Sequence, residues 1–134
     1  WVAIVRAGSF TLRGVRSPEA RKHLSAMRVR DSVLFYHSQL ERTVVGELEV
    51  TRAAYPDPTQ FDHGSPYFDA KSPRAAPRWF CVDVRALRKT RLMPVTEMRA
   101  HAALAKMWAL RPGNRLSITP VTPAEWKFIC SRLR

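Results

Sequence analysis

The chain of 134 residues has few acidic residues, and this shortage has consequences for its partners. Only 11 Asp and Glu stand against 23 Lys and Arg, so the formal net charge is +12. Such an excess attracts polyanions, which makes nucleic acid or an anionic membrane surface the expected partner. The alternative interpretation is a solvated basic surface without a specific partner.

Cysteine and long apolar runs are scarce as well. The two cysteines, Cys81 and Cys130, are too few for a disulfide framework and are predicted to be buried thiols in a reducing compartment. No run approaches the roughly 20 apolar residues that a membrane span needs. The cysteine usage predicts an intracellular protein. We further expect a monomer whose partner is nucleic acid and not a membrane, nuclear in a eukaryote and cytoplasmic otherwise.

Patterns typical of catalysis and of metal binding are also missing. The four histidines and the cysteines lack metal-ligand spacing, and the chain has neither a glycine-rich phosphate loop nor a nucleophile elbow. Acidic residues such as Asp57, Asp62 and Asp69, beside His63, are predicted to hold turns rather than a cation. These observations favour a protein that is not an enzyme and uses no cofactor or metal.

With 46% hydrophobic and 25% charged residues, the chain is long enough for one domain over residues 1–134 with its own core. Ser17, Pro18 and Glu19 predict the start of a helix, and Thr122, Pro123 and Glu125 predict a capping box that starts another. A third helix is expected over residues 96–108, with an apolar stripe made of Met98, Ala102, Ala105 and Trp108.

Strands are predicted from apolar alternation over residues 1–5, 33–38, 43–52, 79–87 and 115–119. Gly46 inside one of them indicates a bulge or a close approach. Residues 55–77 form a long, proline-rich loop that is expected to pack down and to serve function. The order of elements predicts an α+β domain, namely a partly open β-barrel of mostly antiparallel strands with short peripheral helices.

Several motifs in this order resemble the EVE domain family, a branch of the PUA-like barrels related to YTH domains. They are GVRSPEAR (residues 14–21), LFYHS (34–38), AYPDPTQFD (54–62), SPYFD (65–69), PRWFCVDV (77–84) and RLSITPVTPAEW (115–126). The resemblance implies a PUA-like fold and a module that recognises a methylated or hydroxymethylated base in DNA or RNA. Stacking on aromatic side chains contributes about 1–3 kcal/mol per base.

The chain departs from the family pattern at three places. The segment after Trp1 lacks the Lys-Ser-Glu-Pro run of the family, and Ser17-Pro18-Glu19 stands where members usually have Asn-Tyr-Gln. Arg30 occupies a turn position where the family usually has glycine, so the turn is more basic here.

In the long loop, Asp57 and Tyr67 accompany Tyr55, and Asp57 is predicted to hold the turn after Pro56. The candidate ligand-binding residues follow from the motifs. They are Arg16, Ser17, Tyr36, His37, Ser38, Tyr55, Trp79, Arg115 and Ser117. Each has a structural alternative: Ser17 as a helix cap, Arg16 as a surface residue, Tyr36 and Trp79 as packing residues.

A basic strip on the first helix and the following turn is predicted to follow the phosphate backbone. It consists of Arg21, Lys22, Arg28 and Arg30. Phosphate contacts supply affinity and base contacts supply selectivity. Two other functions stay open: an enzyme acting on RNA or a modified nucleotide, as suspected of related ASCH-type barrels, and a module that binds acidic protein partners.

Overall fold

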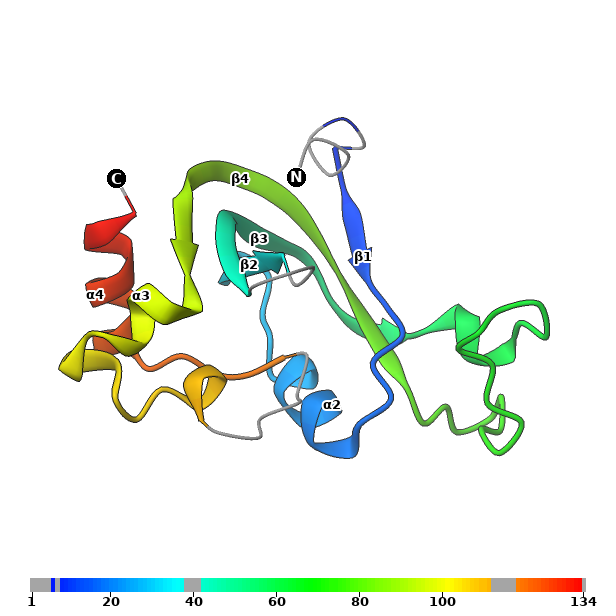
Figure 1. The fold of residues 1–134 in the computed structure, drawn as a ribbon. Coiled ribbons are helices and arrows are strands. Elements are labelled where there is room, and N and C mark those ends of the chain that lie inside the picture. Colours follow the sequence, from blue (N-terminus) through cyan, green and yellow to red (C-terminus); the bar gives the residue numbers. More distant parts are fainter. Residues whose placement is uncertain (1–5, 7, 38–41, 112–117, 134) are drawn as a thin grey trace.

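The fold is known from a computed structural model, which describes residues 6, 8–37, 42–111 and 118–133. Its centre is one antiparallel sheet of four strands in the order β1-β4-β3-β2. The strands are β1 (Phe10–Leu12), β2 (Ser32–His37), β3 (Thr43–Pro56) and β4 (Phe80–Pro94). Short helices lie around this sheet (Figure 1). The predicted α+β class with antiparallel strands and short peripheral helices is thereby confirmed, and the sheet is open.

The two long strands β3 and β4 curve strongly along their length (Figure 1). Their pairing shifts register at four places, one of them between Val44 and Gly46. Bulges of this kind bend a strand and increase its twist. The bulge predicted at Gly46 is confirmed, and both strands run beyond their predicted ends, so that Tyr55 lies inside β3 rather than in the following loop.

Helix α2 (Pro18–Ser25) begins as predicted, because Ser17 caps it by accepting a hydrogen bond from the Ala20 N–H. Its apolar face carries Ala20 and Leu24, which are fully buried against the sheet. This first core cluster also contains Val15, Leu48, Val50, Val82 and Val84.

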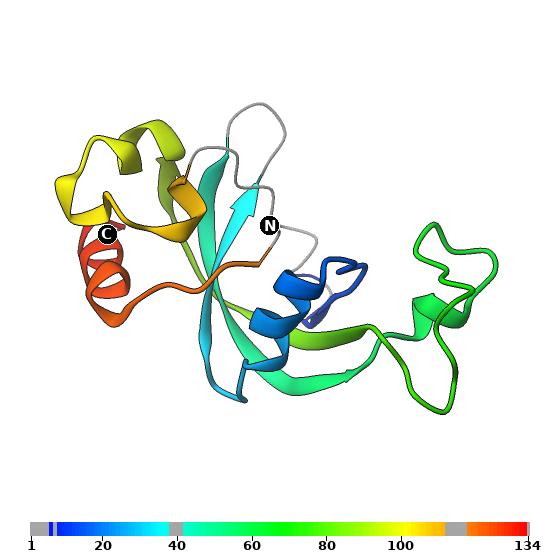
Figure 2. The same ribbon diagram turned by 90° about the horizontal axis from the view of Figure 1, so that it is seen from below.

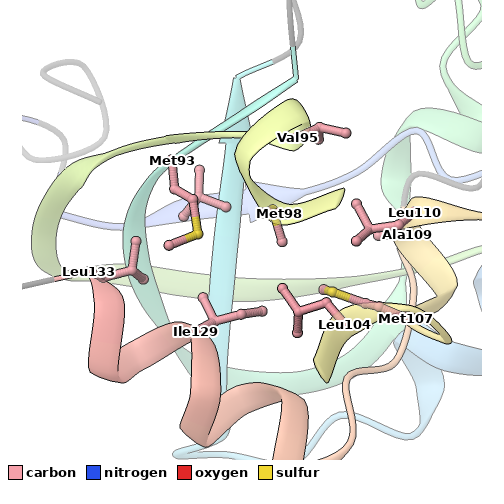
Figure 3. Close-up of a cluster of buried hydrophobic side chains, with 10 residues drawn as sticks. Met93, Val95, Met98, Leu104, Met107, Ala109, Leu110, Ile129 and Leu133 are labelled. Carbon is pink, nitrogen blue, oxygen red and sulfur yellow. The ribbon is translucent and has the colours of Figure 1, made fainter. Parts of the chain in front are cut away.

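A second cluster lies at the other end of the sheet, between β4, the short helical turns that follow it and α4 (Pro123–Arg132) (Figure 3). Met93, Met98 and Met107 form it with aliphatic side chains from the late helices. Thr122 and Glu125 form the predicted capping box of α4, which sets the start of this helix and turns Ile129 and Leu133 into the cluster.

The prediction of a single helix over residues 96–108 is wrong. The chain forms three short pieces instead: α3 (Val95–Arg99) and the 3-10 turns η2 (Ala102–Leu104) and η3 (Trp108–Leu110). Met98 is buried as expected, but Ala102 and Ala105 are exposed. The buried positions Leu104, Met107 and Leu110 recur every three residues, which suits the three-residue turn of a 3-10 helix better than an α-helix.

The loop between β3 and β4 forms an arm, residues 57–79, which projects beyond the end of the sheet (Figure 2). It contains one 3-10 turn, η1 (Pro58–Phe61), and packs around buried polar groups. The strand predicted at residues 1–5 and most of the one at 115–119 lie outside the described residues. Among those that are described, no helix is long and apolar enough to cross a bilayer.

Candidate base-binding pocket

A pocket of about 670 Å³ opens between α2, β2 and the segment of residues 118–126 that leads into α4. Figure 2 shows α2, β2 and the segment before α4 near one another. Its walls are mostly apolar and include Leu12, Met27, Val33, Phe35, Leu48, Met107, Ile118, Val121 and Trp126. A pocket of this size and character is typical of small-ligand sites in proteins.

Each wall follows from local structure. His23 lies on α2 next to the buried Leu24, and Met27 follows the end of that helix, where its N–H donates to the Leu24 carbonyl at 3.1 Å. Both His23 and Met27 line the pocket. On β2, a register shift between Phe35 and Tyr36 interrupts the regular alternation of side chains, and both residues line the pocket. The capping box of α4 fixes the helix on which Trp126 forms the third wall.

Few polar side chains reach this pocket. The Tyr36 hydroxyl donates to the sulfur of Met98 at 3.9 Å. Burial raises the pKa of Tyr36, and this effect outweighs the positive charge of Arg42, which lowers the pKa. Asp31 accepts a hydrogen bond from the Arg28 N–H at 2.8 Å. The Nε2 atom of His23 is buried and has no hydrogen-bond partner within the described part of the chain.

A basic turn, residues 28–31, borders the pocket between the lining residues Met27 and Asp31. The Arg30 N–H donates to the Val50 carbonyl at 2.8 Å, and the Val50 N–H donates to the Asp31 carbonyl at 2.9 Å, so the turn is tied to β3. The side chains of Arg28 and Arg30 are exposed. Arg30 has a φ of +79°, a left-handed conformation that costs an L-residue free energy.

Arg16 lies away from the pocket and ties the arm to the chain before α2. Its guanidinium makes an ion pair with Asp57 at 3.2 Å and donates further bonds to Thr59 Oγ1 and to the Tyr67 and Val15 carbonyls. These contacts use all five N–H donors of an arginine side chain. The geometry therefore favours a structural role for Arg16.

Asp57 is the partner around which this junction is built. Its side chain is fully buried and accepts bonds from the Gly14 N–H and from the Thr59 N–H and hydroxyl. Burial works to raise the pKa of Asp57, but the bonds from Gly14, Thr59 and Arg16 outweigh it and hold the pKa below its ordinary value. Asp57 is thus an ionised anchor of the arm.

Trp79 is only 5% exposed, and its indole N–H donates to Asp69 at 2.7 Å. The guanidiniums of Arg16, Arg21 and Arg78 lie 5.2–5.6 Å from its ring centroid. Cation–π contacts of this kind hold the base of the arm. Arg21, predicted to bind phosphate, is also half-buried here and donates to the Arg78 carbonyl at 2.8 Å.

Tyr55 belongs to a separate hydrogen-bonded group. Its hydroxyl donates to Asp83 at 2.6 Å, and Asp83 also accepts from the Thr11 hydroxyl at 2.9 Å. Burial and the bond to Asp83 raise the pKa of Tyr55 to about 12. Tyr55 does not line the pocket.

Of the predicted ligand-binding residues whose side chains are described, only Tyr36 lines the pocket, and Ser17 serves as the cap of α2. Lys22 is exposed on α2. Ser38, Arg115 and Ser117 lie outside the described residues, and of His37 only the backbone, at the end of β2, is described.

The acidic residues of the arm hold turns, as predicted. Asp62 accepts from the Gly64 N–H and Asp69 from the Lys71 N–H, both at 2.9 Å. The described residues contain no group of three or more His, Cys, Asp or Glu that could hold a metal ion.

His23 and Trp126 are pocket residues that the sequence analysis did not single out. The place of His23 on α2 follows from the helix start, but only the position of the segment 118–126 shows that this residue faces a pocket.

The profile of the EVE domain matches residues 1–132 of the chain. This chain belongs to the EVE domain family. Among the curated relatives, thymocyte nuclear protein 1 of Gallus gallus is 38% identical over 127 residues, which cover 88% of this chain and 52% of the relative. The Homo sapiens protein of that name is 37% identical, with 88% and 56% covered. The chain thus spans about half the length of these relatives.

Solved structures of EVE-like chains agree with this assignment. A protein of Pseudomonas syringae superposes with a TM-score of 0.94 at 30% identity, covering 99% of this chain and 91% of that one. Human THYN1 protein, solved in complex with DNA containing 5-methylcytosine, superposes with a TM-score of 0.88 at 33% identity, covering 94% and 79%. The resemblance to the EVE family predicted from the motifs is confirmed.

Proposed function

We propose that this EVE domain binds DNA and takes a modified base, with 5-methylcytosine as the first candidate, into the pocket between α2, β2 and residues 118–126. The observation that carries the proposal is the position of this largely apolar pocket directly beside the exposed basic turn of residues 28–31. Human THYN1 protein, solved with DNA containing 5-methylcytosine, supports the choice of ligand.

The pocket offers the features that such a base needs. Phe35, Tyr36 and Trp126 supply aromatic surface, and each base stacked on such surface is worth about 1–3 kcal/mol. A base that leaves a duplex loses its stacking and pairing, so an enclosed apolar site must compensate for that loss. The added methyl group contributes only about 1–3 kcal/mol, so selectivity requires a closely fitting wall.

The basic turn provides the affinity that does not depend on sequence. Arg28 and Arg30 are exposed at the rim, where they would meet the phosphates on either side of an extruded nucleotide. Each phosphate contact releases counterions, so binding weakens as salt is added.

The test is fluorescence anisotropy with matched DNA and RNA oligonucleotides, plain or carrying one 5-methylcytosine or 5-hydroxymethylcytosine, at two salt concentrations. We expect a preference for modified DNA that persists at the higher salt. The variant Trp126→Ala should reduce that preference about tenfold or more, whereas Arg28→Ala should weaken binding to every oligonucleotide and lower the salt slope by about 1.

Leu92→Ala serves as the control, because Leu92 is 60% exposed and does not line the pocket. Equal binding of all oligonucleotides that disappears with salt would contradict base recognition and leave only a basic surface. Product analysis of the same mixtures tests the enzymatic alternative, since conversion of the modified oligonucleotide would establish turnover.

A further inference from the structure

His23 contains the one buried side-chain nitrogen or oxygen atom without a hydrogen-bond partner in the described part of the chain, its Nε2. Buried polar atoms in native proteins are almost always paired, so an exception requires an explanation. His23 lies on α2 and lines the pocket. The unpaired nitrogen therefore belongs to a residue of the pocket wall and lies under its surface, rather than in one of the two core clusters.

The ring of His23 is held in place by its neighbours. Trp108 of η3 packs against it edge to face, with 5.0 Å between the ring centroids and an interplanar angle of 78°. The guanidinium of Arg111 lies 4.7 Å from the Trp108 ring centroid and supports that indole from another side. A ring positioned in this way meets a ligand with little further loss of conformational freedom.

Two other polar groups of the pocket wall have partners within the protein. Tyr36 donates its hydroxyl hydrogen to Met98, and Asp31 accepts from the backbone of the basic turn. His23 Nε2 differs from both, because nothing in the described protein satisfies it. An imidazole nitrogen either donates or accepts a hydrogen bond, according to its tautomer, so it suits the polar edge of a base.

We propose that His23 is a specificity-determining residue whose Nε2 forms a hydrogen bond with the edge of the base in the pocket. This inference rests on the proposed function and adds the group that reads the base. A site built to hydrogen-bond its ligand rejects analogues that lack the partner atom, because the buried polar group is then left unpaired.

The test compares His23→Phe with wild type, using DNA that carries one 5-methylcytosine and the same DNA without the methyl group. Phenylalanine keeps an aromatic ring against Trp108 and removes the nitrogen. We expect His23→Phe to bind the methylated DNA about tenfold more weakly, close to the strength of one hydrogen bond. Plain cytosine presents the same edge atoms, but it stays stacked in the duplex without the methyl contact, so phosphate contacts dominate its binding, which should stay within about twofold.

The matched control is His101→Phe, which makes the same chemical change outside the pocket. His101 packs edge to face on Phe128 at 5.1 Å and does not line the pocket. This variant should keep the wild-type preference. The melting temperature of free His23→Phe should equal or exceed that of wild type, because the variant loses a buried unpaired polar atom.

Analogues of the base locate the hydrogen bond. A 5-methyl-2-pyrimidinone lacks the exocyclic amino group, and a 3-deaza analogue lacks the ring acceptor. One of the two should lower affinity for wild type but not for His23→Phe, and this coupling would identify the paired atom. A merely structural role for His23 would produce no such coupling.

Three results would overturn the inference. The first is an unchanged preference of His23→Phe for methylated DNA. The second is that each analogue lowers the affinity of wild type and of His23→Phe by the same factor. The third is a melting temperature of His23→Phe several degrees below that of wild type. If wild type itself shows no preference for methylated DNA, the proposed function fails as well. That outcome is distinct from a preference that survives the loss of His23.

Discussion

Replacing Arg30 with glycine should make the protein more stable and a weaker binder of DNA at the same time. Arg30 has a φ of +79°, in a turn whose backbone is bonded to Val50 of β3. An L-residue in this conformation costs about 1–2 kcal/mol, whereas glycine adopts it freely. Glycine also gives the unfolded chain more conformational freedom, which lowers the free energy of unfolding by about 0.4–1 kcal/mol.

The net change is a gain in the free energy of unfolding of about 0.5–1 kcal/mol. For a domain of this size, such a gain raises the melting temperature by roughly 2–4 °C. The lost guanidinium removes one phosphate contact at the pocket rim, so the slope of log K against log salt should fall by about 0.9. Thermal denaturation and anisotropy titrations between about 50 and 200 mM salt measure both quantities.

Two further variants separate strain from charge. Arg30→Ala removes the charge but keeps the positive φ, so it should bind like Arg30→Gly without the gain in stability. Arg30→Lys keeps the charge and the strain, so both properties should stay near those of wild type. A melting temperature of Arg30→Gly at or below that of wild type would refute the strain argument, and an unchanged salt slope would refute the phosphate contact.

Two predictions concern the junction between the arm and α2. Asp57→Asn should lower the free energy of unfolding by about 3 kcal/mol, because it removes the negative charge that faces the Arg16 guanidinium. The folded pKa of Asp57 lies below its ordinary value of 3.8, so its contribution is complete above that pH and is lost as the pH falls through the folded pKa. Urea denaturation at a series of acidic pH values should therefore show that the free energy of unfolding falls more steeply with falling pH in wild type than in Asp57→Asn. Parallel curves of this free energy against pH would contradict the assignment. Gly14→Ala should destabilise by at least about 1–2 kcal/mol in urea denaturation, because φ is +78° and a Cβ would lie 2.6 Å from the Tyr67 ring. Gly14→Ala with Tyr67→Ala tests the clash, since the double variant should lose less than the sum of the two single losses.

Local chemistry made several elements predictable. The Ser17-Pro18 start of α2 and the capping box of α4 are satisfied by atoms within three residues, so short patterns are sufficient to define them. The bulge at Gly46 was likewise readable from one glycine in an alternating strand. The motifs pointed to the EVE family because they occur in the right order along the chain.

The segment from Val95 to Leu110 shows where local patterns failed. Its apolar residues fit one α-helix about as well as the broken path that the chain adopts. The choice depends on burying Leu104 and Met107 together with Ile129 of α4, a contact between segments about 20 residues apart in sequence. Tertiary packing overrides helix propensity in such a case.

The candidate site, too, was predictable from the sequence only in part. The sequence by itself determined the charge excess, the family, the caps and the basic character of the turn at residues 28–31, because each depends on composition or on neighbours in the chain. Only the tertiary structure decided that Arg16 and Trp79 anchor the arm, and that His23 and Trp126 face a common pocket. The Arg16–Asp57 pair joins residues 41 positions apart and the two pocket residues are more than 100 apart, so folding alone brings them together.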